Sequence, residues 1–203
     1  MPAPEYKMAE VEDLEIGRDE NPFQYSVIPF MDVMEIGNVG QKRDALSRIA
    51  SSFSPRFAPS LKKALQDESS AIRVQAATAI TKIENRFHDK LLKIVQLHRE
   101  HPKNPVIKKA LAEHYDNYAF TGLLDSEREH LNREKARELY LEYLQLRPED
   151  VDVRLKIGRL LIRNDYLDQA VDWFKHSLDD GYTTDSMKVW YMECLYRKIN
   201  LME

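Results

Sequence analysis

The feature that most constrains the fold is a nearly unbroken succession of helical apolar patterns separated by short polar breaks. Within each segment, apolar residues recur every three or four positions, as on one face of a helix. The segments are 23–36, 41–54, 57–66, 70–85, 88–98, 105–120, 131–146, 151–163, 167–179 and 185–198, with Pro29 expected in the first turn of the first. Only 6 Gly and 9 Pro interrupt the chain, and no segment alternates as a strand would. The sequence therefore predicts an all-α protein.

Charge is distributed unevenly along the 203 residues. The first 40 residues carry 9 acidic and 2 basic side chains, whereas residues 41–103 carry 13 basic and 6 acidic, a net charge of +7. A basic block of this kind attracts nucleic acid or anionic surfaces, but it also attracts the acidic segment of its own chain, which is the simpler interpretation. Residues 1–21 are polar and acidic without apolar periodicity, so we expect a flexible lead-in.

The sequence offers few groups for chemistry. It has no Gly-rich phosphate loop, no Gly-x-Ser-x-Gly elbow and no His-Glu-x-x-His helix. His98 and His101 are spaced for one helical face, but Pro102 follows at once and no third metal ligand is apparent. Cys194, the one cysteine, sits in an apolar helical pattern without a partner base. We therefore expect no catalytic residue, no cofactor and no metal site, and predict that the protein is not an enzyme.

Residues 55–84 resemble a HEAT repeat. Pro59 falls inside the first helix, Asp67 follows eight residues later, and Arg73 lies near the start of the second helix. The resemblance implies that Pro59 bends its helix and that Asp67 and Arg73 pair along the stack, so all three are expected to be structural. Lys42 lies 31 residues before Arg73 and matches it in a degenerate preceding repeat. We assign residues 22–103 to HEAT-like helices.

Residues 104–203 resemble tetratricopeptide repeats with a C-terminal capping helix. Gly158 and Ala170 hold the small-residue positions at which two antiparallel helices of such a repeat pack closely. An insertion around residues 122–131 departs from the tight turn of the family. Together the two resemblances predict a right-handed α-solenoid of helical hairpins, HEAT-like and then tetratricopeptide-like.

In tetratricopeptide arrays the first helix of each hairpin lines a concave binding groove. The resemblance places nine residues of this chain there: Lys109, Glu113, Asn117, Lys156, Arg159, Arg163, Val189, Glu193 and Arg197. Arg159 and Arg163 lie one helical turn apart, so they are able to present two cations to an acidic or helical segment of a partner. The alternative is that both arginines decorate a solvated helix, or that Arg163 pairs with Asp165 or Asp168.

The order of these segments resembles the PelE family, whose members belong to the bacterial Pel exopolysaccharide synthase complex. The resemblance is carried by residues 25–32, by Gln41-Lys42-Arg43, by the two helices of residues 57–77 and by the tetratricopeptide-like half. It implies a non-catalytic scaffold that binds PelD, the cyclic-di-GMP receptor of the complex. Members of the family begin with transmembrane helices that this sequence lacks, so a membrane contact would require a segment absent from this chain.

Localisation and an alternative function follow from composition. The start lacks the features of a signal peptide, and no stretch approaches the ~20 apolar residues of a membrane helix, so we expect a cytoplasmic protein, at the inner face of the bacterial inner membrane if the resemblance holds. The alternative function is nucleic-acid binding through the basic HEAT-like face, although lysines and arginines on outer helical faces are usually solvated and we consider this class unlikely. That face would comprise Lys42, Arg43, Arg48, Arg56, Lys62 and Lys63.

Overall fold

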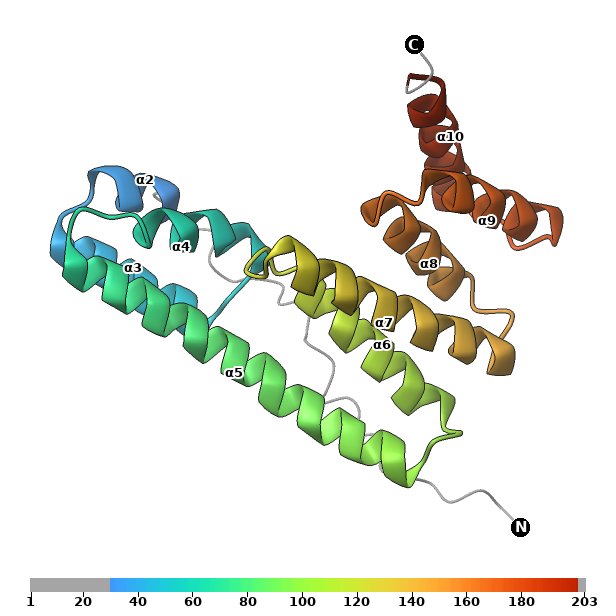
Figure 1. Cartoon of the computed structure of the whole chain (residues 1–203), viewed down its shortest axis with the longest axis horizontal. Coiled ribbons are helices and arrows are strands. Elements are labelled where there is room, and N and C mark those ends of the chain that lie inside the picture. Colours follow the sequence, from blue (N-terminus) through green and yellow to red (C-terminus); the bar gives the residue numbers. More distant parts are fainter. Residues whose placement is uncertain (1–29, 201–203) are drawn as a thin grey trace. The chain divides into compact units, whose positions relative to one another are not determined.

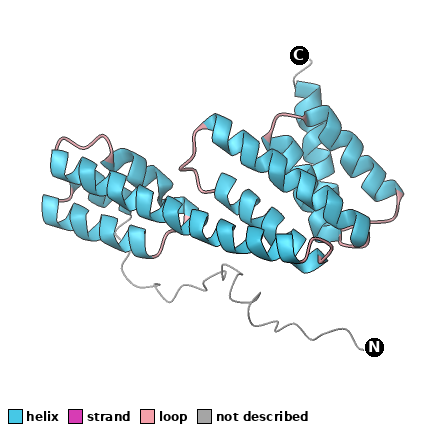
Figure 2. Cartoon of the chain, turned by 60° about the horizontal axis from the view of Figure 1, so that its bottom comes forward, coloured by secondary structure: helices cyan, strands magenta, loops and turns pink. Residues whose placement is uncertain are grey.

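The computed structural model describes residues 30–200, and within that range the chain is helical with no β-strand (Figures 1 and 2). The all-α prediction is confirmed for these residues. The helices are α2 (Phe30–Ile36), α3 (Val39–Ser51), the 3-10 helix η1 (Pro55–Phe57), α4 (Ala58–Ala64), α5 (Ser70–Glu100), α6 (Pro105–Ala119), α7 (Ser126–Leu146), α8 (Val151–Arg163), α9 (Leu167–Asp179) and α10 (Asp185–Asn200). The expected acidic lead-in and Pro29 lie outside the described residues.

The chain divides into two compact units. Unit 1 comprises the described residues up to Leu97 together with Asn117–Asp125, and unit 2 comprises His98–Asp116 together with the described residues from Ser126 onward. No helix of the described part is long and apolar enough to cross a membrane.

Unit 1 is built around α3 and the first part of α5, which run side by side in Figure 1. Asn38 and Gln41 form a reciprocal capping box at the start of α3, with hydrogen bonds of 3.0 and 2.9 Å between each side chain and the other's backbone N–H. The buried core draws on α2, α3, α4 and α5; it contains Met34, Ala45, Leu46, Ile49, Ala50, Leu61, Ala64, Ile72, Ala76, Ala79 and Ile83.

Two helix boundaries in the first half differ from the sequence-based prediction. A break was expected at Asn85, but α5, which is 31 residues long, continues through it to Glu100. Asn85 is exposed, and one exposed Asn costs a helix well under 1 kcal/mol, whereas Pro or Gly would cost more. Pro59 was expected inside a helix that it bends; instead η1 precedes α4 and places Pro59 in the first turn, where its missing N–H costs nothing.

Unit 2 contains α7, α8, α9 and α10, together with the larger part of α6. Its core includes Tyr140, Ile157, Leu160, Phe174 and Met187, each almost fully buried. Helix α7 begins five residues before the expected start, because Glu127 and Glu129 in its first turn interact favourably with the helix dipole. Most of the predicted insertion is therefore helical.

The predicted small-residue contact lies between α8 and α9. Gly158 and Ala170 are buried, and a Cβ added to Gly158 would lie 2.1 Å from the ring of Phe174. The indole nitrogen of Trp173 donates a 2.9 Å hydrogen bond to the carbonyl of Arg154 and joins the same two helices. Any larger residue at position 158 would force α8 and α9 apart.

Candidate functional site

Charged residues on α6 and α8 form a continuous polar face in unit 2. Lys109, Glu113 and Asp116 on α6 are spaced by four and three residues, and Lys156, Arg159 and Arg163 on α8 by three and four, so each set lies on one side of its helix. This α6–α8 face, defined by those six residues, contains five of the nine groove residues predicted from the sequence.

Capping and tertiary hydrogen bonds fix α8 in place. Asp150 caps its start, accepting a 3.0 Å hydrogen bond from the Val153 N–H. At the other end, Arg133 of α7 donates to the Arg163 carbonyl at 3.1 Å, and Asn164 donates to Glu134 at 2.6 Å. Helix α8 is therefore held at both ends, and its polar residues project from a fixed frame.

Three cations of the face are paired with carboxylates across helices. Lys156 forms an ion pair with Glu113, and Arg163 lies 3.4 Å from Asp116. Lys109 lies 2.9 Å from Asp150. Arg163 therefore has an acidic neighbour on α6, and Asp168 pairs with Lys198.

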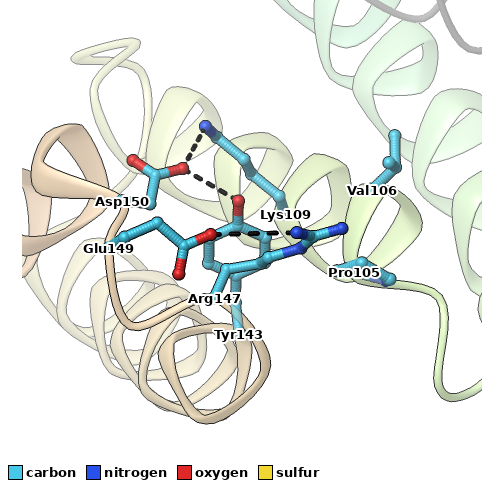
Figure 3. Close-up of a pocket in the computed structure, with 7 residues that line it drawn as sticks. All are labelled: Pro105, Val106, Lys109, Tyr143, Arg147, Glu149 and Asp150. Carbon is cyan, nitrogen blue, oxygen red and sulfur yellow. Dashed lines mark hydrogen bonds and ion pairs between the residues drawn. The ribbon is translucent and has the colours of Figure 1, made fainter.

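The Lys109 pair borders a shallow hollow of about 500 Å³ (Figure 3). Asp150 accepts from Lys109 and, at 2.8 Å, from the hydroxyl of Tyr143. Burial alone would raise the pKa of Asp150, but these hydrogen bonds and the one from Val153 outweigh it and lower the pKa. The other lining residues are Pro105, Val106, Arg147 and Glu149, and the last two lie 3.8 Å apart. Both cations of the hollow therefore have acidic neighbours within the chain.

The pKa of Asp116 is shifted in the opposite direction from that of Asp150. Burial raises its pKa above the usual value, even though Arg163, Lys156 and Arg159 act to lower it. Burial also lowers the pKa of Arg163, against the attraction of Asp116. For both Asp116 and Arg163, the protein environment therefore favours the charged form less than water does.

Arg159 differs from its neighbours on α8. Its Nε atom is buried and has no hydrogen-bond partner among residues 30–200, and its guanidinium lies over the Trp190 ring of α10, 5.4 Å from the centroid. A cation–aromatic contact of this kind holds an arginine in place without satisfying its N–H groups. Arg159 is therefore held by Trp190, and none of the ion pairs found between the described residues involves it.

Tyr140 of α7 adds a second unsatisfied group near this face. Its side chain is fully buried, and its hydroxyl has no hydrogen-bond partner in the described part of the chain. Burial is the main cause that raises its pKa, and the charges of Asp116 and Glu113 raise it further. Buried polar groups without partners are uncommon in native proteins, and two of those in the described residues belong to Tyr140 and Arg159.

The remaining predicted groove residues do not join this face. Val189, Glu193 and Arg197 lie on α10, where Glu193 and Arg197 pair with each other at 2.7 Å and Val189 is exposed. Asn117 is exposed and belongs to unit 1, and Asp116 takes the place on α6 that the sequence analysis gave to Asn117. A spacing of four and four residues rotates away from a helical face faster than one of four and three.

In unit 1, Asp67 pairs with the cation that lies one repeat before Arg73, and Arg73 itself contacts backbone carbonyls. Asp67 pairs with Lys42 at 2.6 Å, and its carboxylate also accepts from the Ser69 N–H at 2.9 Å. Arg73 donates instead to the carbonyls of Asp67 and Glu68, at 2.8 and 2.9 Å. Lys42, which matches Arg73 one repeat earlier, thus supplies the cation that pairs with this aspartate.

Several cations of the basic HEAT-like face also have partners. Lys42 pairs with Asp67, Arg43 donates to Gln75 at 3.1 Å, and Lys63 lies 3.6 Å from Glu35. Part of the positive charge is therefore balanced within unit 1. No group of three His, Cys, Asp or Glu residues in the described range is placed to hold a metal ion. Cys194 is buried, and burial raises its pKa.

Sequence reasoning missed Asp116, Tyr140 and the contact of Trp190 with Arg159. Asp116 was detectable in principle, because it follows Glu113 by three residues on the same helical pattern. The other two depend on contacts between helices, for which the sequence carries no local signal.

No family model matches the chain, and neither a curated protein nor a solved structure matches it. The fold and face define an all-helical protein with a charged helical surface in unit 2.

Proposed function

We propose that the protein is a non-catalytic scaffold that binds a partner protein through the α6–α8 face of unit 2. The observation that carries the proposal is Arg159, which lies against Trp190 and whose Nε has no partner among the described residues, while Lys109, Lys156 and Arg163 are paired. Arginine and tryptophan are the residues most enriched where binding energy concentrates, and here they lie in contact. A carboxylate of the partner would pair with the charge of Arg159 through the accessible part of its side chain, which is only half-buried.

The proposed partner is PelD, the cyclic-di-GMP receptor of the Pel exopolysaccharide synthase complex. Support comes from the PelE-like order of motifs, in which a HEAT-like segment with Pro59, Asp67 and Arg73 precedes tetratricopeptide-like helices with Gly158 and Ala170. We further propose that the hairpins stack as a right-handed solenoid and that the protein acts at the cytoplasmic face of the inner membrane, in biofilm exopolysaccharide synthesis.

Affinity for the cytosolic part of PelD, measured by titration calorimetry with the full chain, tests the proposal. Arg159→Glu should weaken binding at least tenfold, because it removes an attraction and places a negative charge opposite an acidic partner. Lys175→Glu makes the same charge change at an exposed position of α9 and should leave affinity within twofold. Arg163→Glu is a poorer test, since it would set two carboxylates side by side at Asp116.

Two results would count against the proposal in different ways. If wild-type protein does not bind PelD, the partner assignment is wrong. If it binds and Arg159→Glu binds equally well while circular dichroism shows it folded, the assignment of the α6–α8 face is wrong.

A further inference from the structure

The last helix carries an apolar stripe on the face turned away from the core. Met187 and Cys194 of α10 are fully buried against the rest of unit 2. Four large apolar residues lie on the other side, and each is between 60% and 64% exposed: Val189, Met192, Tyr196 and Ile199. Their spacing of three, four and three residues aligns them along one line of the helix.

This pattern differs from that of a terminal helix facing water. Capping helices of repeat proteins have a polar outer face, because a contiguous apolar patch otherwise promotes association. The three-four-three spacing is also the seam along which two helices interdigitate their side chains. Helix α10 therefore has one face for its own unit and a second face built for another helix.

We propose that this second face binds the same face of a second copy of the chain, with the two α10 helices antiparallel about a twofold axis. The stripe is symmetric about position 194, so an antiparallel pairing sets Val189 against Ile199 and Met192 against Tyr196 of the other copy. A twofold interface requires a self-complementary surface, and this stripe satisfies that requirement. Cys194 points into the core at the centre of the helix and takes no part.

Charges at the edge of the stripe fit the same arrangement. Glu193 and Arg197 lie along one flank and pair within α10 at 2.7 Å, with both side chains substantially exposed. In an antiparallel pairing centred on position 194, Glu193 of each copy is offset by two residues from both Arg197 and Glu193 of the other copy. Two unlike pairs and one like pair then meet, so the four charges form one neutral cluster with a net attraction. Four apolar side chains and two charges per copy make a small interface, so we expect micromolar association.

Sedimentation velocity of the full chain between about 5 and 500 μM, with no partner present, tests the inference. The wild-type protein should pass from monomer to dimer over this range. Met192→Glu and Tyr196→Glu should each weaken dimerisation at least tenfold, because they place a charge in the apolar seam. Leu92→Glu, at an exposed apolar residue of unit 1, is the matched control and should dimerise like the wild type.

A charge exchange separates this arrangement from other dimers. Glu193→Arg and Arg197→Glu proteins should each dimerise more weakly than the wild type, and an equimolar mixture should recover association, because unlike charges then meet across the axis. A monomer at all concentrations, a dimer indifferent to the α10 variants, open-ended oligomers or a mixture without recovery would each overturn the inference. Because no partner protein is present, none of these outcomes bears on the role proposed for Arg159.

Discussion

The two units use charged residues in different ways. In unit 1, cations donate to backbone carbonyls or pair closely with an aspartate: Arg86 donates to the carbonyls of Ala50 and Ser51, at the end of α3, and Lys42 pairs with Asp67. In unit 2, charges lie mid-helix along the α6–α8 face, where burial raises the pKa of Asp116 and the Nε of Arg159 has no partner among residues 30–200.

This difference shows in the pKa values of two aspartates. The hydrogen bond from Lys42, followed by that from the Ser69 N–H, lowers the pKa of Asp67, so its charge stabilises unit 1. Burial raises the pKa of Asp116, so its charge opposes the stability of unit 2. The charges of these two aspartates therefore act on stability in opposite directions.

The largest effect on the free energy of unfolding should follow from adding a methyl group at Gly158. Gly158→Ala places a methyl group inside the space of the Phe174 ring, and overpacking of this kind costs about 2–3 kcal/mol. Urea unfolding followed by tryptophan fluorescence measures it, because Trp173 and Trp190, the only two tryptophans, both lie in unit 2.

Phe174→Leu supplies the control for this steric explanation. The smaller side chain should absorb part of the Gly158→Ala cost, so that the double variant is more stable than the sum of the single effects predicts. Additive effects would mean that the two residues do not share one packing constraint.

A smaller effect should follow in unit 1 when the arginine that caps α3 is removed. Arg86→Met preserves the apolar stem but loses two hydrogen bonds to carbonyls at the helix end, and should lower the free energy of unfolding by about 1–2 kcal/mol. Circular dichroism should detect the loss, whereas the tryptophan signal of unit 2 should shift less. If circular dichroism and tryptophan fluorescence show equal shifts of the unfolding midpoint, the two units unfold as one. The difference between the units in their use of charge then does not produce separate stabilities.

Much of this fold could be predicted from apolar periodicity, as the bounds of α8 and α9 show, because both helices end at strong local signals. Asn85 misled the prediction, since a polar residue alone does not end a helix that tertiary packing supports. The sequence predicted some residues of the α6–α8 face but not their partners. Lys109, Lys156 and Arg163 were placed by the tetratricopeptide resemblance. Their partners, Asp150, Glu113 and Asp116, depend on how neighbouring helices meet, which the spacing within one helix does not specify.

In unit 1 the charge of Asp67 adds to stability, whereas in unit 2 the charge of Asp116 opposes it. Comparing Asp67→Asn with Asp116→Asn by urea unfolding at pH 7 tests it most directly. Asn keeps an acceptor for Arg163 but removes the buried charge, so Asp116→Asn should raise the free energy of unfolding, while Asp67→Asn should lower it.

Acidification should change the two effects in ways that follow from the directions of the pKa shifts. The contribution of Asp67 is fully present above the usual aspartate pKa of 3.8 and is lost as pH falls through its lowered folded pKa. The penalty from Asp116 is fully present above its raised folded pKa and disappears as pH falls from there toward 3.8. We therefore expect Asp116→Asn to raise the free energy of unfolding at pH 7, and we expect this increase to vanish near pH 4. A loss of stability in Asp116→Asn at pH 7, comparable to that in Asp67→Asn, would contradict it.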